Sequence, residues 1–279
     1  MRYKRLTKDD YEDILEISRH IWDGNDYLPK VFHKWVEDEE GYFIGVELED
    51  KIVAVGKYTI LKDGQGWLEG LRVHPSYRGR QLAHAVTDVL FNIAREDLKN
   101  KKITNIAMCT HKDTPASIKM MEDRKFKLED SCMVVFKEYE NLDKNMDYRN
   151  YKFEKWDITY EEFKELEIFK NNNNKIIGTF VFYNLCRDVY NELVRNNSLV
   201  KINGHECIVM KKDTFSIMCI ENSFEPINIC ANYYLSKYKV REVEIYISNY
   251  DEDLIANLKA NNYYSILNYE KDCVYYVYR

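Results

Sequence analysis

One stretch in the first half of the chain restricts the possible folds more than any other. Residues 67–83 read WLEGLRVHPSYRGRQLA. A strand-like run ends at Val73, a proline turn follows, and a loop with glycine and arginine opens a long amphipathic helix. The first N–H groups of a helix have no partner within it, and together with the macrodipole they attract anions. Arg78 and Arg80 add positive charge, and Gly79 allows close approach of the backbone. The stretch therefore predicts a site for a diphosphate-bearing cofactor.

The spacing of this loop excludes two common phosphate-binding motifs. It is neither GxxxxGK[ST] nor GxGxxG, and no acidic residue stands where a ribose would need one. An ordinary glycine-containing turn with solvated arginines is the alternative that the loop alone leaves open.

The elements around this loop follow a legible order. Amphipathic spacing after Thr7 predicts a first helix, and Pro29 suits the first turn of a second helix. Runs rich in β-branched and aromatic residues predict strands, and two of these form a hairpin. The expected strands are 42–48, 52–60, 67–73, 103–109 and 133–136, and the further helices are 80–96 and 114–122.

Composition indicates two domains. The chain has 279 residues, of which 45% are hydrophobic, so it can bury sizeable cores. Eight of the ten glycines lie at or before Gly79, whereas sixteen of the 23 tyrosines follow position 147. A polar, aperiodic seam at 138–152 separates the two compositions. We expect domains at residues 1–140 and 152–279, with a single domain and a biased tail as the alternative.

Charge and cysteine usage exclude several classes of protein. The net charge is −6, so no basic excess exists to neutralise a nucleic-acid backbone. No apolar run approaches the length of a membrane helix, and the N-terminus lacks the apolar core of a signal peptide. Seven cysteines occur without a CxxC pair, which argues against a disulfide framework or a zinc site. We expect reduced cysteines and a cytoplasmic protein.

The second half contains a segment that looks like a repeat. Residues 103–126 align with 240–263, and both copies read as a strand, a helix and a further strand. The second copy has no counterpart of the arginine loop, because Glu221 and Glu225 stand in its place. Two carboxylates there would repel a diphosphate. We expect residues 152–279 not to bind cofactor.

The loop and the order of elements resemble the GNAT superfamily of N-acetyltransferases, whose acetyl-CoA loop has the pattern (Q/R)xxGx(G/A). Here it reads Arg78-Gly79-Arg80-Gln81-Leu82-Ala83. The resemblance implies an α/β (α+β) chain with the GNAT fold, expected as two tandem GNAT-like domains that each have a mixed central sheet. Gln81 replaces the glycine of the pattern. A Cβ at this position is tolerated only if φ is negative and the side chain turns away from the pyrophosphate.

Two blocks resemble vertebrate histidine N-acetyltransferases and their relatives. One block runs from Ile21 to Trp35 and the other from Glu69 to Val73. In GNAT folds, the loop between the first two helices lines the acceptor pocket. The resemblance therefore implies a small-molecule amine as acceptor, a free α-amino acid with histidine as a candidate. Its implied binding residues are Asp26, Tyr27 and His33.

The resemblance also implies direct transfer of acetyl from acetyl-CoA to the amine. Backbone groups near Leu71, Arg72 and Val73 would align the thioester, and Ser117 is a further candidate contact with the cofactor, or else a surface serine. Glu69 is the candidate general base, and strand alternation predicts that it shares a face with Leu71 and Val73. The alternative for Glu69 is an exposed or ion-paired strand glutamate. Met121 occupies the position where many GNAT enzymes have a tyrosine acid, so the group that protonates the thiolate is not identified.

Other readings of the chain stay open at this point. A peptide or protein amine could be the acceptor, or the chain could be an acyl-CoA sensor without catalysis. The six histidines show no metal-ligand spacing, so no metal is expected. A monomer is favoured over a homodimer, since the second domain could cover the first as a second subunit would.

Overall fold

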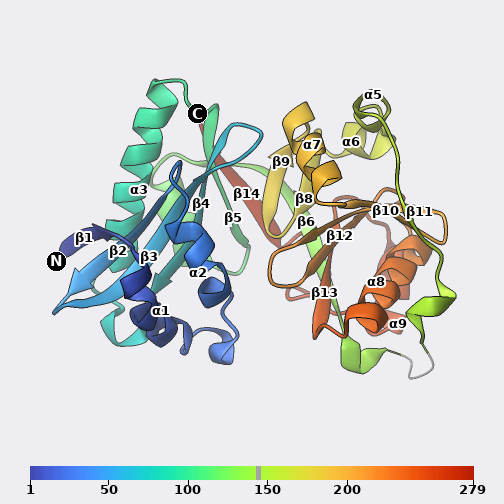
Figure 1. Ribbon diagram of the computed structural model, residues 1–279, viewed down its shortest axis with the longest axis horizontal. Helices are drawn as coiled ribbons and strands as arrows, with labels where there is room; N and C mark the ends of the chain where they lie inside the picture. The colour runs from blue at the N-terminus through green and yellow to red at the C-terminus, as the bar shows by residue number, and fades with distance from the viewer. Residues whose placement is uncertain (143–145) are drawn as a thin grey trace. The chain divides into compact units, whose positions relative to one another are not determined.

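The computed structural model describes residues 1–142 and 146–279 (Figure 1). The chain folds into two compact units. Unit 1 contains residues 1–108, 119–127 and 276–279, and unit 2 contains residues 109–118 and 128–275. Part of the predicted seam, residues 143–145, lies outside the described residues. The two units are interleaved along the chain and are not continuous segments. The domains 1–140 and 152–279 stay a prediction.

Unit 1 is built on strands in the order β1-β2-β3-β4-β5. Strands β1 (Arg2–Arg5), β2 (Tyr42–Leu48), β3 (Lys51–Ile60) and β4 (Gln65–Val73) are antiparallel neighbours. Strand β5 (Asn105–His111) pairs with β4 in parallel, from Gln65↔Asn105 to Trp67↔Ala107. The predicted mixed sheet is confirmed.

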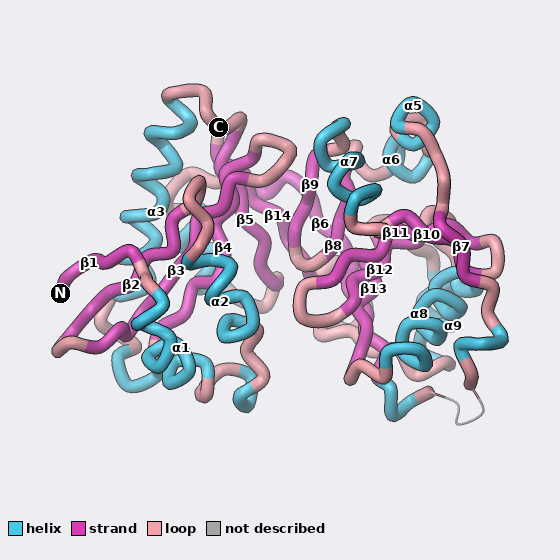
Figure 2. Tube along the Cα trace, in the orientation of Figure 1, coloured by secondary structure: helices cyan, strands magenta, loops and turns pink. Residues whose placement is uncertain are grey.

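Helices cover both faces of this sheet (Figures 1 and 2). Helices α1 (Tyr11–Ser18) and α2 (Leu28–Val36) pack on one face through Ile14, Phe32 and Val55. Helix α3 (Leu82–Lys99) lies on the other face, where Val86 and Leu90 approach Gly56. Helix α4 (Pro115–Glu122) begins in unit 2 and ends in unit 1. The hydrophobic spacing of α3 explains this packing, since its apolar positions recur along one stripe.

Unit 2 has strands in the order β6-β13-β12-β11-β10-β7. Its core on one side is formed with the long helix α8 and with α9. On the other side, a hairpin of β8 and β9 and the short helices α5, α6 and α7 cover the sheet. The strands are β6 (Lys127–Glu138), β7 (Phe153–Lys155), β8 (Lys175–Gly178), β9 (Val181–Asn184), β10 (Leu199–Ile202), β11 (His205–Lys211), β12 (Phe215–Cys219), β13 (Glu242–Ile247) and β14 (Cys273–Tyr278). The helices are α5 (Tyr160–Phe163), α6 (Glu167–Asn171), α7 (Arg187–Arg195), α8 (Phe224–Tyr238) and α9 (Glu252–Ala260).

The two units contain the same order of three antiparallel strands, a helix and a parallel strand. In unit 2 the antiparallel strands β10, β11 and β12 lead into α8, and β13 then returns parallel to β12. In unit 1 the strands β2, β3 and β4 lead into α3, and β5 returns parallel to β4. The spacing predicted for the repeat is also found, because β13 and α9 start 137 residues after β5 and α4 (Asn105 and Glu242, Pro115 and Glu252). This agreement supports the proposed repeat.

The strand that follows each repeated helix passes from one unit to the other. Residues from Leu128 onward in β6 belong to unit 2, where β6 pairs with β13. Residues Tyr276–Arg279 belong to unit 1, where the Tyr278 ring lies 5.0 Å from the Phe91 ring and 5.7 Å from the Phe126 ring. Each compact unit therefore needs residues from both halves of the sequence.

Two further expectations concern helices and thiols. Among the described residues, no helix is both long enough and apolar enough to cross a bilayer. All seven cysteines are free thiols.

Candidate functional site

A β-bulge in β4 arranges the side chains of the predicted site. Lys57 on β3 is opposite Glu69, and Val55 is opposite Arg72, so two residues of β4 face Gly56. One of the two is Gly70, whose φ of +67° favours glycine. A Cβ on Gly70 would also lie 2.5 Å from the Trp35 ring, which excludes larger residues. The bulge therefore needs glycine for both its conformation and its packing.

The bulge overturns the predicted alternation along β4. Residues opposite each other in a ladder share a face, so Glu69 and Arg72 lie on the face of Lys57 and Val55. Val55 packs with α1 and α2, so this is the face that those helices cover. Val73 is opposite Ala54 and lies on the other face. The expectation that Glu69 and Val73 share a face is wrong, because the extra residue of the bulge shifts the alternation by one.

Glu69 lies half-buried in a polar group on this face. Its Oε1 accepts a hydrogen bond of 2.8 Å from Thr59 Oγ1. Lys57, across the ladder, is fully buried and its Nζ donates to Asp38 and to the Tyr58 carbonyl. Burial lowers the pKa of the Lys57 ammonium, although Asp38 opposes this. Thr59 thus holds the Glu69 carboxylate, and the Lys57–Asp38 ion pair lies beside it on the neighbouring strand. No sequence pattern had pointed to these three residues.

Arg72 and Asp26 form a buried ion pair. The guanidinium binds the carboxylate through Nε to Oδ2 at 3.0 Å and through Nη2 to Oδ1 at 2.9 Å. The Asp26 side chain is fully buried, and Leu28 N also donates to it. Such a bidentate pair fixes geometry as well as charge. It ties the loop before α2 to the end of β4.

Two aromatic rings lie over this ion pair. The Arg72 guanidinium is 4.7 Å from the Trp22 ring and 5.2 Å from the Tyr27 ring, within the range of cation–π contacts. The side chain of Trp22 is 60% exposed, so the group borders solvent. The structure thus brings together Asp26, Tyr27 and Arg72, which the sequence analysis assigned to two different ligands.

The predicted phosphate loop is exposed at the start of α3. Residues 78–81 are all exposed, and Gly79 has a φ of +77° with open space where a Cβ would be. The Arg80 guanidinium lies over the Tyr77 ring at 5.1 Å. Gln81, at the start of the helix, makes no capping hydrogen bond through its side chain, and the first turn holds no acidic residue. The N-terminus of this helix therefore keeps its positive end available to an anion.

Gln81 has a φ of +60°, so the condition of a negative φ is not met. The left-handed conformation costs a residue with a Cβ about 1–2 kcal/mol. The Gln81 carbonyl accepts the first helical bond, from Ala85 N at 3.0 Å, and this holds the residue in place. Leu82 is buried and Ala83 half-buried, so both anchor the loop.

The remaining predicted residues lie in varied settings. Leu71 and Val73 are in β4, whose ladder with β5 uses only Gln65–Trp67. After Trp67, the backbone N–H and C=O groups of β4 that face β5 do not pair with β5. Ser117 is half-buried on α4, within the part of that helix that belongs to unit 2. His33 is exposed on α2, where its ring stacks on Tyr11 at 5.0 Å.

Met121 is a core residue. Its side chain is 2% exposed, and it follows the equally buried Met120, which receives a contact from Thr87 Oγ1. A buried thioether cannot donate a proton to a leaving thiolate.

One group of possible metal ligands is present among the described residues, on unit 1. Glu16 of α1 and His20, two residues after the end of that helix, lie close to His74, which follows β4, and one donor atom from each lies within 4.8 Å of the others. No sequence spacing indicates this group, because the two histidines are 54 positions apart in the chain.

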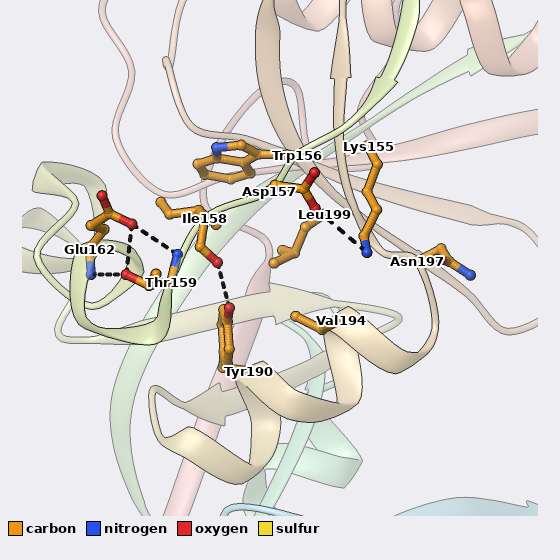
Figure 3. A pocket seen from close by; sticks show the side chains of 10 residues that line it. All are labelled: Lys155, Trp156, Asp157, Ile158, Thr159, Glu162, Tyr190, Val194, Asn197 and Leu199. Atoms are coloured by element: carbon orange, nitrogen blue, oxygen red, sulfur yellow. Dashed lines mark hydrogen bonds and ion pairs between the residues drawn. The ribbon is translucent and has the colours of Figure 1, made fainter.

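A pocket of about 270 Å³ lies in unit 2 between the start of α5, α7 and the segment after β7 (Figure 3). None of the predicted site residues lines it. Thr159 and Glu162 form a capping box, and the Tyr190 hydroxyl donates to the Ile158 carbonyl. Because these polar groups bind one another, the pocket offers few groups that would fix the orientation of a ligand.

One sequence signal could have revealed the bulge. An isolated glycine within a strand pattern often marks a bulge or a close approach, and Gly70 stands alone between Glu69 and Leu71. Neither Thr59 nor Asp38 carried a comparable signal, because their roles depend on pairing across strands.

Comparison with known proteins agrees with this geometry. Residues 7–126 match the model of the Acetyltransferase (GNAT) family. These residues form a GNAT acetyltransferase domain.

Two curated relatives match part of the first half. A histidine N-acetyltransferase of Oreochromis niloticus is 30% identical over 102 residues, which is 36% of this chain and 29% of that protein. A histidine N-acetyltransferase of Scomber australasicus is 25% identical over 107 residues, which is 38% of this chain and 32% of that protein. The chain thus spans about a third of each of these relatives.

A solved structure matches the whole fold. The GCN5-related N-acetyltransferase of Sphaerobacter thermophilus superposes with a TM-score of 0.61 at 10% identity, over 99% of this chain and 95% of that one. The whole chain therefore has a GNAT fold.

Proposed function

We propose that this protein is an N-acetyltransferase that moves acetyl from acetyl-CoA to the amine of a small molecule, with a free α-amino acid as the acceptor. The observation that carries the proposal is the N-terminus of α3, which opens from an exposed loop with Arg78 and Arg80 and has no acidic residue in its first turn. It lies in a GNAT acetyltransferase domain, a family that uses acetyl-CoA.

The proposed cofactor site uses the loop and the helix together. The N–H groups of the first turn of α3 would donate to diphosphate oxygens, and Arg78 and Arg80 would add charge-assisted hydrogen bonds. Gly79 would let the backbone approach closely, since nothing lies within 4 Å of where its Cβ would be. Backbone groups near Leu71 and Val73 would align the thioester, and such alignment can contribute several kcal/mol, about 7 in favourable cases. Ser117 remains a proposed further contact.

Glu69 is the proposed general base. The acceptor amine must lose a proton before it can attack, and a carboxylate can take that proton directly or through one water. The nitrogen lone pair then forms the new C–N bond to the thioester carbon, and the C–S bond breaks as the thiolate of CoA leaves. The hydrogen bond from Thr59 to Oε1 orients the carboxylate. Solvent is the proposed proton source for the thiolate, because Met121 is buried and cannot donate.

The proposed acceptor site lies on the same face as Glu69. Asp26 neutralises Arg72, and the exposed ring of Trp22 stacks over the pair beside Tyr27. A small amine with a planar or apolar body would gain contact area from these rings. The similarity to the two histidine N-acetyltransferases supports an amino acid, with histidine as the first acceptor to test. His33 remains a proposed acceptor contact, although its ring packs on Tyr11.

The test is a mass-spectrometric search for acetylated products. Purified protein is mixed with acetyl-CoA and a pool of free amino acids and simple amines. One dominant acetylated amino acid supports the proposal and identifies the acceptor. Acetylation of peptides alone would replace the small-molecule acceptor by a protein amine. Binding of acetyl-CoA without any product would instead indicate a sensor.

A further inference from the structure

We propose that Glu16, His20 and His74 form a binding site for a divalent transition-metal ion of the Zn²⁺ type. None of these residues takes part in the proposed acetyl transfer. All three residues belong to unit 1, and metal binding there does not depend on the proposed acetyl transfer.

The three donor atoms have nearly the spacing of ligands around one ion. His20 Nε2 lies 3.4 Å from Glu16 Oε1, and His74 Nε2 lies 3.9 Å from the same oxygen. Ligands on a tetrahedral zinc ion lie about 3.3 Å apart, because zinc–donor bonds are about 2.0–2.1 Å long. Small rotations of exposed side chains would close the difference. The Glu16 and His20 side chains are 46% and 45% exposed, so both can make them.

Helix geometry positions two of the ligands. Glu16 and His20 are four residues apart on and just after α1, which places them on one face of the helix. Arg19 binds the other oxygen of Glu16, Oε2, at 2.6 Å. This contact directs Oε1 toward the two histidines. The edge-on packing of the two imidazoles, with centroids 5.4 Å apart, keeps His74 beside His20.

Metal binding would cost His74 the hydrogen bond that its ring accepts from the backbone of Ser76. Its Nδ1 accepts from Ser76 N at 3.2 Å, so in the metal-free protein the proton of a neutral ring lies on Nε2. Metal binding through Nε2 would move that proton to Nδ1 and release Ser76 N. Ser76 is exposed, so water can replace the lost partner.

The surroundings favour a cation. The site borders a cavity of about 500 Å³ whose charged lining residues besides His74 are Glu12, Asp13, Glu16 and Lys51. Three carboxylates against one lysine make the lining acidic. The cavity leaves room for water at the remaining coordination positions. Two imidazoles and one carboxylate suit zinc and its neighbours better than Mg²⁺ or Ca²⁺, which prefer oxygen ligands.

An ion at this position would join two parts of unit 1. It would tie the C-terminal end of α1 to the turn between β4 and the phosphate loop. His74 packs on Tyr77, and Tyr77 in turn carries the Arg80 guanidinium. We therefore expect metal binding to raise the thermal stability of the protein.

Titration of the chelator-treated full chain with ZnCl₂ tests this site. Calorimetry measures the affinity and stoichiometry, and CoCl₂ reports ligand type through its visible absorption. We expect one ion per chain. The variants His20→Gln, His74→Gln and Glu16→Gln should each lower the affinity for zinc by about 10- to 100-fold or more, because the loss of a direct ligand should cost at least as much as the loss of a residue that only supports a ligand. His205→Gln, a histidine of unit 2, is the matched control and should bind as the unchanged protein does.

Two results would overturn the site. One is equal affinity for the unchanged protein and the His20→Gln/His74→Gln double variant. The other is no binding below roughly 1 mM, the range of the weakest specific complexes. Should the His74 variant fail to fold, as circular dichroism would show, the half-exposed His20 alone decides, because its replacement removes no buried contact. None of these measurements uses acetyl transfer.

Discussion

The N-termini of α3 and α8 occupy the same place in the repeated connection but have opposite charge. Arg78 and Arg80 precede α3, whereas Glu221 precedes α8 and Glu225 lies in its first turn. The hydroxyl of Ser223, the cap residue of α8, donates to Glu221 at 2.7 Å. Carboxylates near a helix N-terminus stabilise it, so α8 satisfies its own dipole where α3 leaves it for a ligand.

The strands that precede these two helices also differ in their acidic residues. Strand β4 carries Glu69 and the bulge at Gly70, whereas β12 reads FSIMC and carries no acidic residue. The comparison teaches that the repeated backbone connection does not by itself make a site. The charged residues and the bulge that are specific to unit 1 do so.

Truncation should have the largest effect, because unit 1 uses the C-terminus. A chain that ends at residue 140 lacks Tyr276 and Tyr278, and the ring of Tyr278 packs on Phe91 and Phe126. We expect loss of more than about 3 kcal/mol of unfolding free energy, as for removal of a large aromatic side chain. Denaturant unfolding of the truncated and full chains measures it. Equal stability would instead support residues 1–140 as an independent domain.

Replacing Glu69 should strongly reduce turnover. We expect Glu69→Gln to lower kcat/KM by about 10²- to 10⁴-fold, the usual contribution of a general base. The matched control is Glu47→Gln on β2, whose carboxylate binds Arg2. A Glu69→Gln protein with full kcat/KM across the pH range would remove the base role and leave Glu69 a structural strand residue.

Removing the loop arginines should weaken acetyl-CoA binding. Each charge-assisted hydrogen bond to phosphate contributes about 1.5–3 kcal/mol, and exposure favours the lower value. Arg78→Ala/Arg80→Ala removes two such bonds, about 3 kcal/mol at the lower value, and should therefore raise the Kd by about 100-fold or more in calorimetry. Glu221→Gln/Glu225→Gln should leave the Kd unchanged with one site per chain. A second site in the unchanged protein would show that unit 2 also binds the cofactor.

Glu244 should make the stability of unit 2 depend on pH. Burial raises the pKa of its carboxyl from 4.5 to about 7, although Tyr246 and Ser216 donate to it. A raised pKa means that its contribution is complete below pH 4.5 and is lost as the pH rises through about 7. Glu244→Gln should therefore gain about 3 kcal/mol at pH 8 and nothing at pH 4, because each pH unit between 4.5 and about 7 corresponds to about 1.4 kcal/mol. As a control, Glu165→Gln at an exposed position should keep the pH dependence of the unchanged protein in denaturant unfolding, because it retains Glu244.

Gln81 should show the smallest effect. Glycine adopts the left-handed conformation without cost, but it loses more entropy on folding. Gln81→Gly should therefore raise the unfolding free energy by at most about 1 kcal/mol, whereas the β-branched Gln81→Val should lower it. Thermal unfolding of the two variants measures the difference. A destabilised glycine variant would show that the Gln81 side chain makes a contribution beyond its backbone conformation.

Local patterns determined much of the fold. The spacing of apolar residues placed α3, and the β-branched runs placed β2, β3 and β4, because these signals act within a few positions of the chain. The repeat of β5 and α4 by β13 and α9 was visible for the same reason. The loop with Arg78 was recognisable because its residues are consecutive.

Only the tertiary structure decided which distant residues meet. The pair of Arg72 and Asp26 and the contact of Thr59 with Glu69 depend on strand register and on a bulge that shifts every later side chain to the opposite face. The last residues of the chain complete unit 1 because packing follows proximity in space. Local sequence patterns thus specify the elements and the phosphate loop, whereas the arrangement of the site depends on long-range strand pairing that brings its parts together.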